Sequence, residues 1–113
     1  MENFNFSYDS ESDDLFVYLE GKKSRGAVEL GNFILDFDEE GDLVAMQILN
    51  VSEVFSKILT KMIKVSEIKE VKMDMVNVRN MNAIRFSISD SQTEEKTNIL
   101  IPHIKERSPV LEY

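Results

Sequence analysis

Residues 32–63 carry two different hydrophobic periodicities side by side, and this stretch constrains the fold most. Its first part alternates in steps of two, which is typical of strands with one buried face. The alternating apolar residues are Phe33, Leu35 and Phe37 before a DEEGD turn, and Val44, Met46 and Ile48 after it. Gly41 stands where a type I turn with a glycine bulge needs a left-handed residue. The pattern therefore predicts a β-hairpin.

The second part of the stretch predicts an amphipathic helix that begins at Asn50 or Ser52. Its apolar residues recur at i, i+3, i+4 and i+7, so they form one stripe. They are Val51, Val54, Phe55, Ile58, Leu59, Met62 and Ile63. Asn50 and Glu53 have the spacing of a capping box. Because the hairpin is the nearest apolar surface, we expect the stripe to pack on it.

Shorter runs on both sides of this stretch also have the period of strands. We expect strands at residues 3–8, 15–20, 27–30, 72–79, 83–89 and 99–101, and a polar loop at residues 89–98. The alternation slips within residues 72–79, which predicts a bulge or burial on both faces. The order of elements is strands, helix, strands. It indicates an α+β fold of antiparallel hairpins with one central amphipathic helix packed on the sheet.

The length and charge of the chain limit its organisation and its partners. The chain has 113 residues and a net charge of −8, and residues 1–50 hold twelve acidic against three basic side chains. Phosphate groups bind basic surfaces, so neither nucleic acid nor an anionic membrane is an expected partner. The acidic half either faces solvent or binds a basic protein partner. We expect a single domain with hairpins and helix in 4–60, C-terminal strands in 66–104 and a tail in 105–113.

The expected location is the cytoplasm. No apolar run approaches the roughly 20 residues of a membrane span. The first residues, MENFNFSYDS, do not have the pattern of a signal peptide. The sequence contains no cysteine, which excludes disulfides and thiolate metal sites.

Two acidic stretches partly match a calcium-loop template. The first match comprises Asp9, Glu11, Asp13 and Glu20, with Asp14 where the template needs glycine. The second comprises Asp36, Asp38, Glu40 and Gly41, with Gln47 where it needs glutamate. Solvated hairpin turns account better for both. A composite cation site remains a candidate, formed across the sheet by Asp9, Asp13, Asp36 and Asp38.

The sequence offers no set of residues for catalysis, so we expect no enzyme and no cofactor. His103 is the only histidine, which excludes a multi-histidine metal site. No Gly-x-Ser-x-Gly motif is present, and the four glycines are too scattered for a phosphate loop. We interpret His103 as a residue at a strand end.

Several apolar residues form a candidate interaction surface. The strand at residues 15–20 is apolar on both faces, with Phe16 and Tyr18 on one of them, so it needs cover on both sides. Met73 and Met75 belong to a methionine-rich stretch, and methionine occurs both in cores and at adaptable binding surfaces. The cover comes either from the C-terminal strands or from a second copy in a homodimer.

The first half of the chain resembles the family known as domain of unknown function 2283. The resemblance covers roughly residues 4–60, on Tyr8, Asp9, Asp13, Leu15, Leu19, Asp36, Asp38, Gly41 and Asn50. The remainder resembles a longer, archaeal type of member. The resemblance implies a small α+β fold and no established activity. Some small members lie beside toxin-like genes, which implies an antitoxin or regulatory role.

Three functions follow as hypotheses. The favoured one is a non-enzymatic protein-interaction module that self-associates. The second is an antitoxin-like regulatory partner of a basic protein. The third is a carboxylate-based protein that binds a divalent metal, with hydrolytic activity as an extension.

Overall fold

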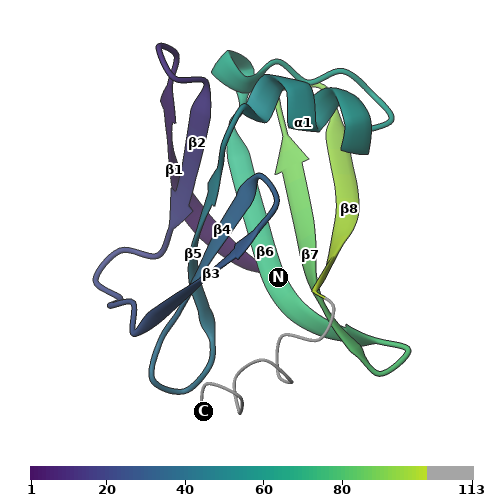
Figure 1. The fold of residues 1–113 in the computed structure, drawn as a ribbon. Helices are drawn as coiled ribbons and strands as arrows, with labels where there is room; N and C mark the ends of the chain where they lie inside the picture. The colour runs from purple at the N-terminus through teal and green to yellow at the C-terminus, as the bar shows by residue number, and fades with distance from the viewer. Residues whose placement is uncertain (102–113) are drawn as a thin grey trace.

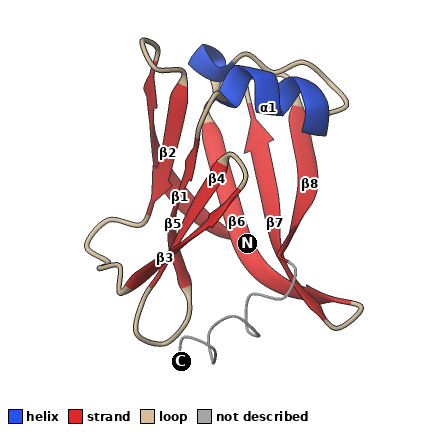
Figure 2. Cartoon of the chain, viewed as in Figure 1, coloured by secondary structure: helices blue, strands red, loops and turns tan. Residues whose placement is uncertain are grey.

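The computed structural model describes residues 1–101, which form one curled antiparallel sheet with a single α-helix at one end (Figures 1 and 2). The strands before the helix are β1 (Glu2–Asp9), β2 (Asp14–Tyr18), β3 (Gly26–Leu30), β4 (Phe33–Phe37) and β5 (Leu43–Ile48). Then come the helix α1 (Val51–Ile58), a 3-10 turn η1 (Val65–Glu67), and the strands β6 (Glu70–Val78), β7 (Met81–Ser89) and β8 (Glu94–Ile101). The predicted α+β fold of antiparallel hairpins with one helix between groups of strands is confirmed.

The hairpin predicted within residues 32–63 is present as β4 and β5. Leu35 pairs with Met46 and both are fully buried, while Phe33 and Phe37 pack against the core from its margin. Gly41 has a φ of +85°, so it adopts the left-handed backbone that the turn needs. The register shifts between Asp36 and Phe37, which pair with Ala45 and Leu43, so the extra residue of this irregularity is Val44 in β5.

Strand β1 joins the two halves of the sheet. The eight strands follow the order β3-β4-β5-β2-β1-β6-β7-β8. Residues 5–9 of β1 pair with β2, whereas residues 2–4 pair with β6. The strand therefore changes partner near Phe4, and the sheet turns a corner there.

The core fills the concave side of the sheet beneath α1. The inner face of the helix is buried and consists of Val51, Val54 and Phe55. The ring centroids of Phe55 and Phe86 lie 6.2 Å apart. The largest fully buried side chains are Phe86, Leu15, Leu35, Met46, Ile48, Met73, Ile84 and Ile88. Burial of each such side chain contributes about 1.5–3 kcal/mol. Both halves of the sheet supply these residues, so they share one core.

The helix is shorter than predicted. It ends at Ile58, and Leu59 is already extended with ψ 142°. Met62 is 80% exposed, while Ile63 reaches the core from the loop after the helix. The reason lies in β8, because Glu95 accepts hydrogen bonds from the amide and the hydroxyl of Thr60, at 2.8 and 2.9 Å. These bonds hold the chain in a non-helical path.

The predicted polar loop at residues 89–98 is wrong in its second half. Residues 94–98 belong to β8, which pairs with β7 along its whole length. The inward positions of this strand include Glu95 and Thr97, whose polar side chains hide the alternation in the sequence. In β6 the ladder runs without a shift from Glu70 to Val78, so there is no bulge, and Val76 and Val78 are half-buried opposite the core face.

The predicted capping box is also wrong. Asn50 has a left-handed backbone with φ 52° and makes no side-chain cap. The carboxylate of Asp13 caps the helix from the β1–β2 turn instead. His103 and the tail at residues 105–113 lie outside the described residues.

Candidate functional site

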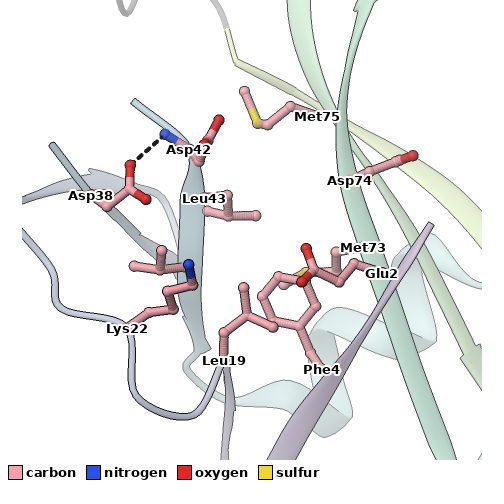
Figure 3. Close-up of a pocket in the computed structure, with 11 residues that line it drawn as sticks. Glu2, Phe4, Leu19, Lys22, Asp38, Asp42, Leu43, Met73, Asp74 and Met75 are labelled. Carbon is pink, nitrogen blue, oxygen red and sulfur yellow. Dashed lines mark hydrogen bonds between the residues drawn. The ribbon is translucent and has the colours of Figure 1, made fainter. Parts of the chain in front are cut away.

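A pocket lies at the corner where β1 changes partner. β2 stops at Tyr18, opposite Asn5, and the chain then turns away, while β6 continues on the other side of β1. The space between them has a volume of about 370 Å³. It is lined by Glu2, Phe4, Leu19, Lys22, Asp38, Asp42, Leu43, Val44, Met73, Asp74 and Met75 (Figure 3). We call it the corner pocket.

The floor of the corner pocket is apolar. Phe4, Leu43 and Met73 are buried, and Leu19 and Met75 are half-buried beside them. Figure 3 shows Leu19 and Phe4 between the two walls. The floor therefore offers aliphatic and thioether groups, which adapt to an irregular apolar partner.

The rim of the corner pocket is acidic. Glu2 lies beside Met73 on one wall, and Asp38 and Asp42 lie on the other, above Lys22 (Figure 3). A rim of this kind, with one lysine among several carboxylates, has a negative potential that attracts cations. An apolar floor beneath it suits a cation that carries an alkyl chain.

Two of the lining carboxylates already have partners. One oxygen of Asp38 accepts the backbone amides of Glu40 and Asp42, at 3.0 and 2.9 Å, and so stabilises the turn. Asp74 accepts two hydrogen bonds from Arg85, at 2.7 and 3.1 Å, and in Figure 3 its side chain is directed away from the pocket. Glu2 and Asp42 are exposed, and their charges are the ones best placed for a ligand.

The structure separates the four aspartates proposed as a composite cation site. Asp9 accepts the amide of Glu11 within its own turn, at 3.0 Å. Asp36 lies in β4, and Asp13 lies in the β1–β2 turn with its carboxylate bound to Ser52 at the start of α1. Only Asp38 belongs to an acidic group: Asp38, Glu40 and Asp42 each offer an oxygen within 4.8 Å of the others. Glu40 and Asp42 were not in the predicted set.

Asp13 joins three elements. It accepts the hydroxyl of Tyr8 at 2.7 Å, the hydroxyl of Ser52 at 2.8 Å and the amide of Ser52 at 3.1 Å. The bond from Tyr8, and then those from Ser52, lower the pKa of Asp13. The same contact raises the pKa of Tyr8. Asp13 is thus a structural carboxylate.

The residues predicted as an interaction surface fall into two places. Phe16 is 42% exposed and stacks on Tyr18, with ring centroids 5.1 Å apart. Both lie on the outer face of β2, a strand that is central in the sheet as predicted. The exposure of Phe16 shows that the described residues do not supply the cover expected on this face. Met73 is fully buried, so the core interpretation holds for it, and Met75 borders the corner pocket.

Sequence reasoning missed most of the corner pocket. Glu2, Leu19, Lys22 and Asp42 come from different segments, and no local pattern links them. The link is the pairing of β1 with β6, which joins residues about 70 positions apart. The usable signals were the dense acidic run of the β4–β5 turn and the methionine-rich stretch that contains Met73 and Met75.

Comparisons with known proteins agree with the predicted family. Residues 5–52 match the family model described as "Protein of unknown function (DUF2283)". The chain is 37% identical over 75 residues to "Uncharacterized protein MJ0789" of Methanocaldococcus jannaschii. This match covers 63% of this chain and 65% of that protein. It is also 37% identical over 51 residues to a protein of Methanosarcina mazei named "Putative hypoxanthine phosphoribosyltransferase". This second match covers 45% of this chain and 42% of that protein.

The chain thus spans less than two thirds of the length of each of these relatives. No solved structure matches it. Among residues 1–101, no helix has the length and apolar character needed to cross a bilayer.

Proposed function

We propose that this protein, whose residues 5–52 match the DUF2283 family model, is a non-enzymatic interaction module that binds a basic segment of a partner protein in the corner pocket. The observation that carries the proposal is the combination of an apolar floor with a carboxylate rim in one cavity. A cytoplasmic location, as predicted from the sequence, is part of the proposal.

The chemistry of the pocket selects a lysine or arginine side chain flanked by apolar residues. The alkyl stem of such a residue packs on the floor, near Leu19 and Met75, while its charged head meets Glu2 and Asp42. Complementary charge of this kind accelerates association and selects against acidic partners. The net charge of −8 adds a long-range attraction for a basic protein.

The lining of the pocket also favours binding over catalysis. Among residues 1–101, the lining includes no serine, threonine, cysteine or histidine, so these residues offer neither a hydroxyl or thiol nucleophile nor an imidazole base. The name of the Methanosarcina relative does not alter this proposal, because the described lining of the pocket has no glycine-rich loop and a single lysine, Lys22, among several carboxylates, which would repel a phosphate.

A peptide titration tests the proposal. A fluorescent peptide of alternating lysine and leucine should bind the protein, and a peptide with glutamate in place of lysine should not. Removing two rim charges with Glu2→Gln and Asp42→Asn should weaken binding by about three- to tenfold, because each exposed ion pair contributes about 0.2–1 kcal/mol.

The matched control removes two charges elsewhere, with Glu29→Gln and Glu67→Gln, both exposed. It keeps the net charge equal to that of the rim variant and should leave affinity nearly unchanged. Equal weakening by the rim and control variants would mean that net charge, rather than the pocket, attracts the peptide. That result would refute the proposed site.

A second candidate function is self-association through the outer face of β2. It depends on the exposed ring of Phe16 and its stacking on Tyr18. A two-fold contact would bury both aromatic pairs. Phe16→Ser should then convert a dimer to a monomer in light scattering without lowering the melting temperature, and a monomeric wild type would remove this candidate.

A further inference from the structure

The loop that joins α1 to η1 presents three exposed side chains, Lys61, Met62 and Lys64. We call this group the knob. Met62 is 80% exposed, which is far more than the other exposed large hydrophobic residues of the described chain, Met1, Phe16 and Leu100. An exposed methionine between two lysines is unusual on a chain that carries an excess of acidic groups. Neither the core nor the helix explains why it is there.

The knob is fixed in place by its neighbours. On one side, Thr60 donates its amide and hydroxyl to the carboxylate of Glu95, which is only 7% exposed. On the other side, Ile63 and Val65 are buried in the core. The loop is therefore held at both ends, and a partner that binds the knob does not need to order it first.

The knob and the corner pocket have complementary chemistry. The knob offers two ammonium groups around a thioether side chain, and the pocket offers carboxylates around a floor that itself contains methionine. The two features lie at different ends of the molecule, because α1 and its loop cap one end of the sheet and the β4–β5 turn lies at the other (Figure 1). One chain cannot bring its own knob to its own pocket.

We propose that the partner bound in the corner pocket is a second copy of this chain, whose knob enters with Met62 on the apolar floor and with Lys61 and Lys64 facing Glu2 and Asp42. This inference rests on the proposed function of the pocket. The contact joins two different surfaces, so it is head-to-tail. A contact of this kind produces a ring or an open chain rather than a two-fold dimer.

Two variants of the full chain test the inference by sedimentation velocity over a range of concentrations. The knob variant carries Lys61→Glu with Lys64→Glu and keeps an intact pocket. The pocket variant carries Glu2→Gln with Asp42→Asn and keeps an intact knob. The wild type should associate with increasing concentration. The pocket variant should lose about three- to tenfold in association constant, and the knob variant, which replaces attraction by repulsion, should lose at least about tenfold.

The mixture of the two variants gives the sharpest result. The intact knob of the pocket variant can enter the intact pocket of the knob variant. The resulting heterodimer presents only an altered knob and an altered pocket, so no third chain can bind. The mixture should therefore form 1:1 heterodimers and nothing larger. All changes lie at exposed residues, and circular dichroism should match that of the wild type. The knob variant should have a somewhat lower melting temperature, because the charge of Lys61 favours the ionised form of Glu95. A variant of Phe16→Ser serves as the control for association through the outer face of β2 and should behave as wild type.

Three results would overturn the inference: a wild type that stays monomeric, an association that survives in both variants, or an association that Phe16→Ser abolishes. The lysine–leucine peptide separates these results from a failure of the proposed function. A monomeric wild type that still binds the peptide, with weaker binding by the pocket variant, would keep the pocket as a basic-segment site and reject the second copy as its partner.

Discussion

Asp13 shows how a single side chain can position an element that is distant in sequence. It adopts φ 59°, a left-handed conformation that aspartate tolerates better than most residues. Its carboxylate supplies the N-terminal cap of α1, a task that the residue before a helix usually performs. The β1–β2 turn and the helix are therefore stabilised by the same group.

Substitution of Asp13 should destabilise the fold measurably. We expect Asp13→Ala to lower the free energy of unfolding by about 1–3 kcal/mol, because it removes the cap and places alanine in a left-handed conformation. Urea denaturation measures the change. Asp13→Asn keeps an acceptor oxygen and should lose less, and Glu11→Ala, an exposed residue of the same turn, should change little. Equal losses for all three would contradict the capping role.

Glu95 makes the stability of the fold depend on pH. Hydrogen bonds from the amide and hydroxyl of Thr60 and from the amide of Lys61 lower the pKa of Glu95 below its ordinary value of 4.5. The folded state thus binds this proton more weakly than the unfolded state. The stabilisation is present in full above the unfolded pKa and is lost as the pH falls through the folded pKa.

The urea midpoint should therefore decrease as the pH falls from 6 to 3, with a smaller decrease in Glu95→Gln. Asp13 and Asp90 have pKa values lowered in the same direction, so the variant should retain part of the dependence. Parallel pH curves for wild type and variant would show that Glu95 does not contribute.

At the scale of the element, α1 depends on its packing. A helix of eight residues is too short to be stable alone. Its stability comes from Val51, Val54 and Phe55, which cover the open end of the core. Phe55→Ala should cost about 3–5 kcal/mol. Met62→Ala, a few residues later in the same predicted stripe, should change the free energy of unfolding by no more than about 0.5 kcal/mol.

Thermal and chemical denaturation of the two variants measure this contrast, with circular dichroism as the probe. A large loss in Met62→Ala would mean that the helix continues past Ile58 and buries this residue. Such a result would also remove the exposed knob on which the head-to-tail contact depends.

Local patterns predicted the elements whose signals are local. The β4–β5 hairpin, with Gly41 in its turn, and the buried face of β7 with Ile84, Phe86 and Ile88 follow the period of two. The predictions for Met62 and for β8 were wrong for the same reason. The apolar spacing at Met62 predicts a continued helix, and the polar residues of β8 hide the strand pattern. Both outcomes depend on the long-range hydrogen bond from the Thr60 amide to Glu95 of β8, which no local pattern reveals.

At the scale of the whole molecule, the corner pocket is a consequence of topology. Strand β1 pairs with β2 over residues 5–9 and with β6 over residues 2–4, and the cavity opens where the partners change. Its walls come from both halves of the chain, so no local sequence pattern contains it. Of the candidate site, the acidic turn that includes Asp38 and the methionine-rich stretch with Met73 and Met75 could be singled out from the sequence, but not their meeting in one cavity.

The distribution of charge has a meaning at this scale too. The acidic half of the sequence supplies Glu2, Asp38 and Asp42 to the pocket rim, and the more basic second half supplies the lysines of the knob. The loop after α1 and the β4–β5 turn lie at different ends of the sheet (Figure 1). This arrangement favours contacts between chains over contacts within one.

Methyl NMR of methionine-labelled protein tests the central claim, that the corner pocket binds a basic segment, most directly. Met73 and Met75 line the pocket, whereas Met46 is buried in the core and Met81 lies at the far hairpin end of β6 and β7. Titration with the lysine–leucine peptide should shift the methyl signals of Met73 and Met75 and leave those of Met46 and Met81 in place. Unchanged signals of Met73 and Met75 at peptide saturation would contradict the account.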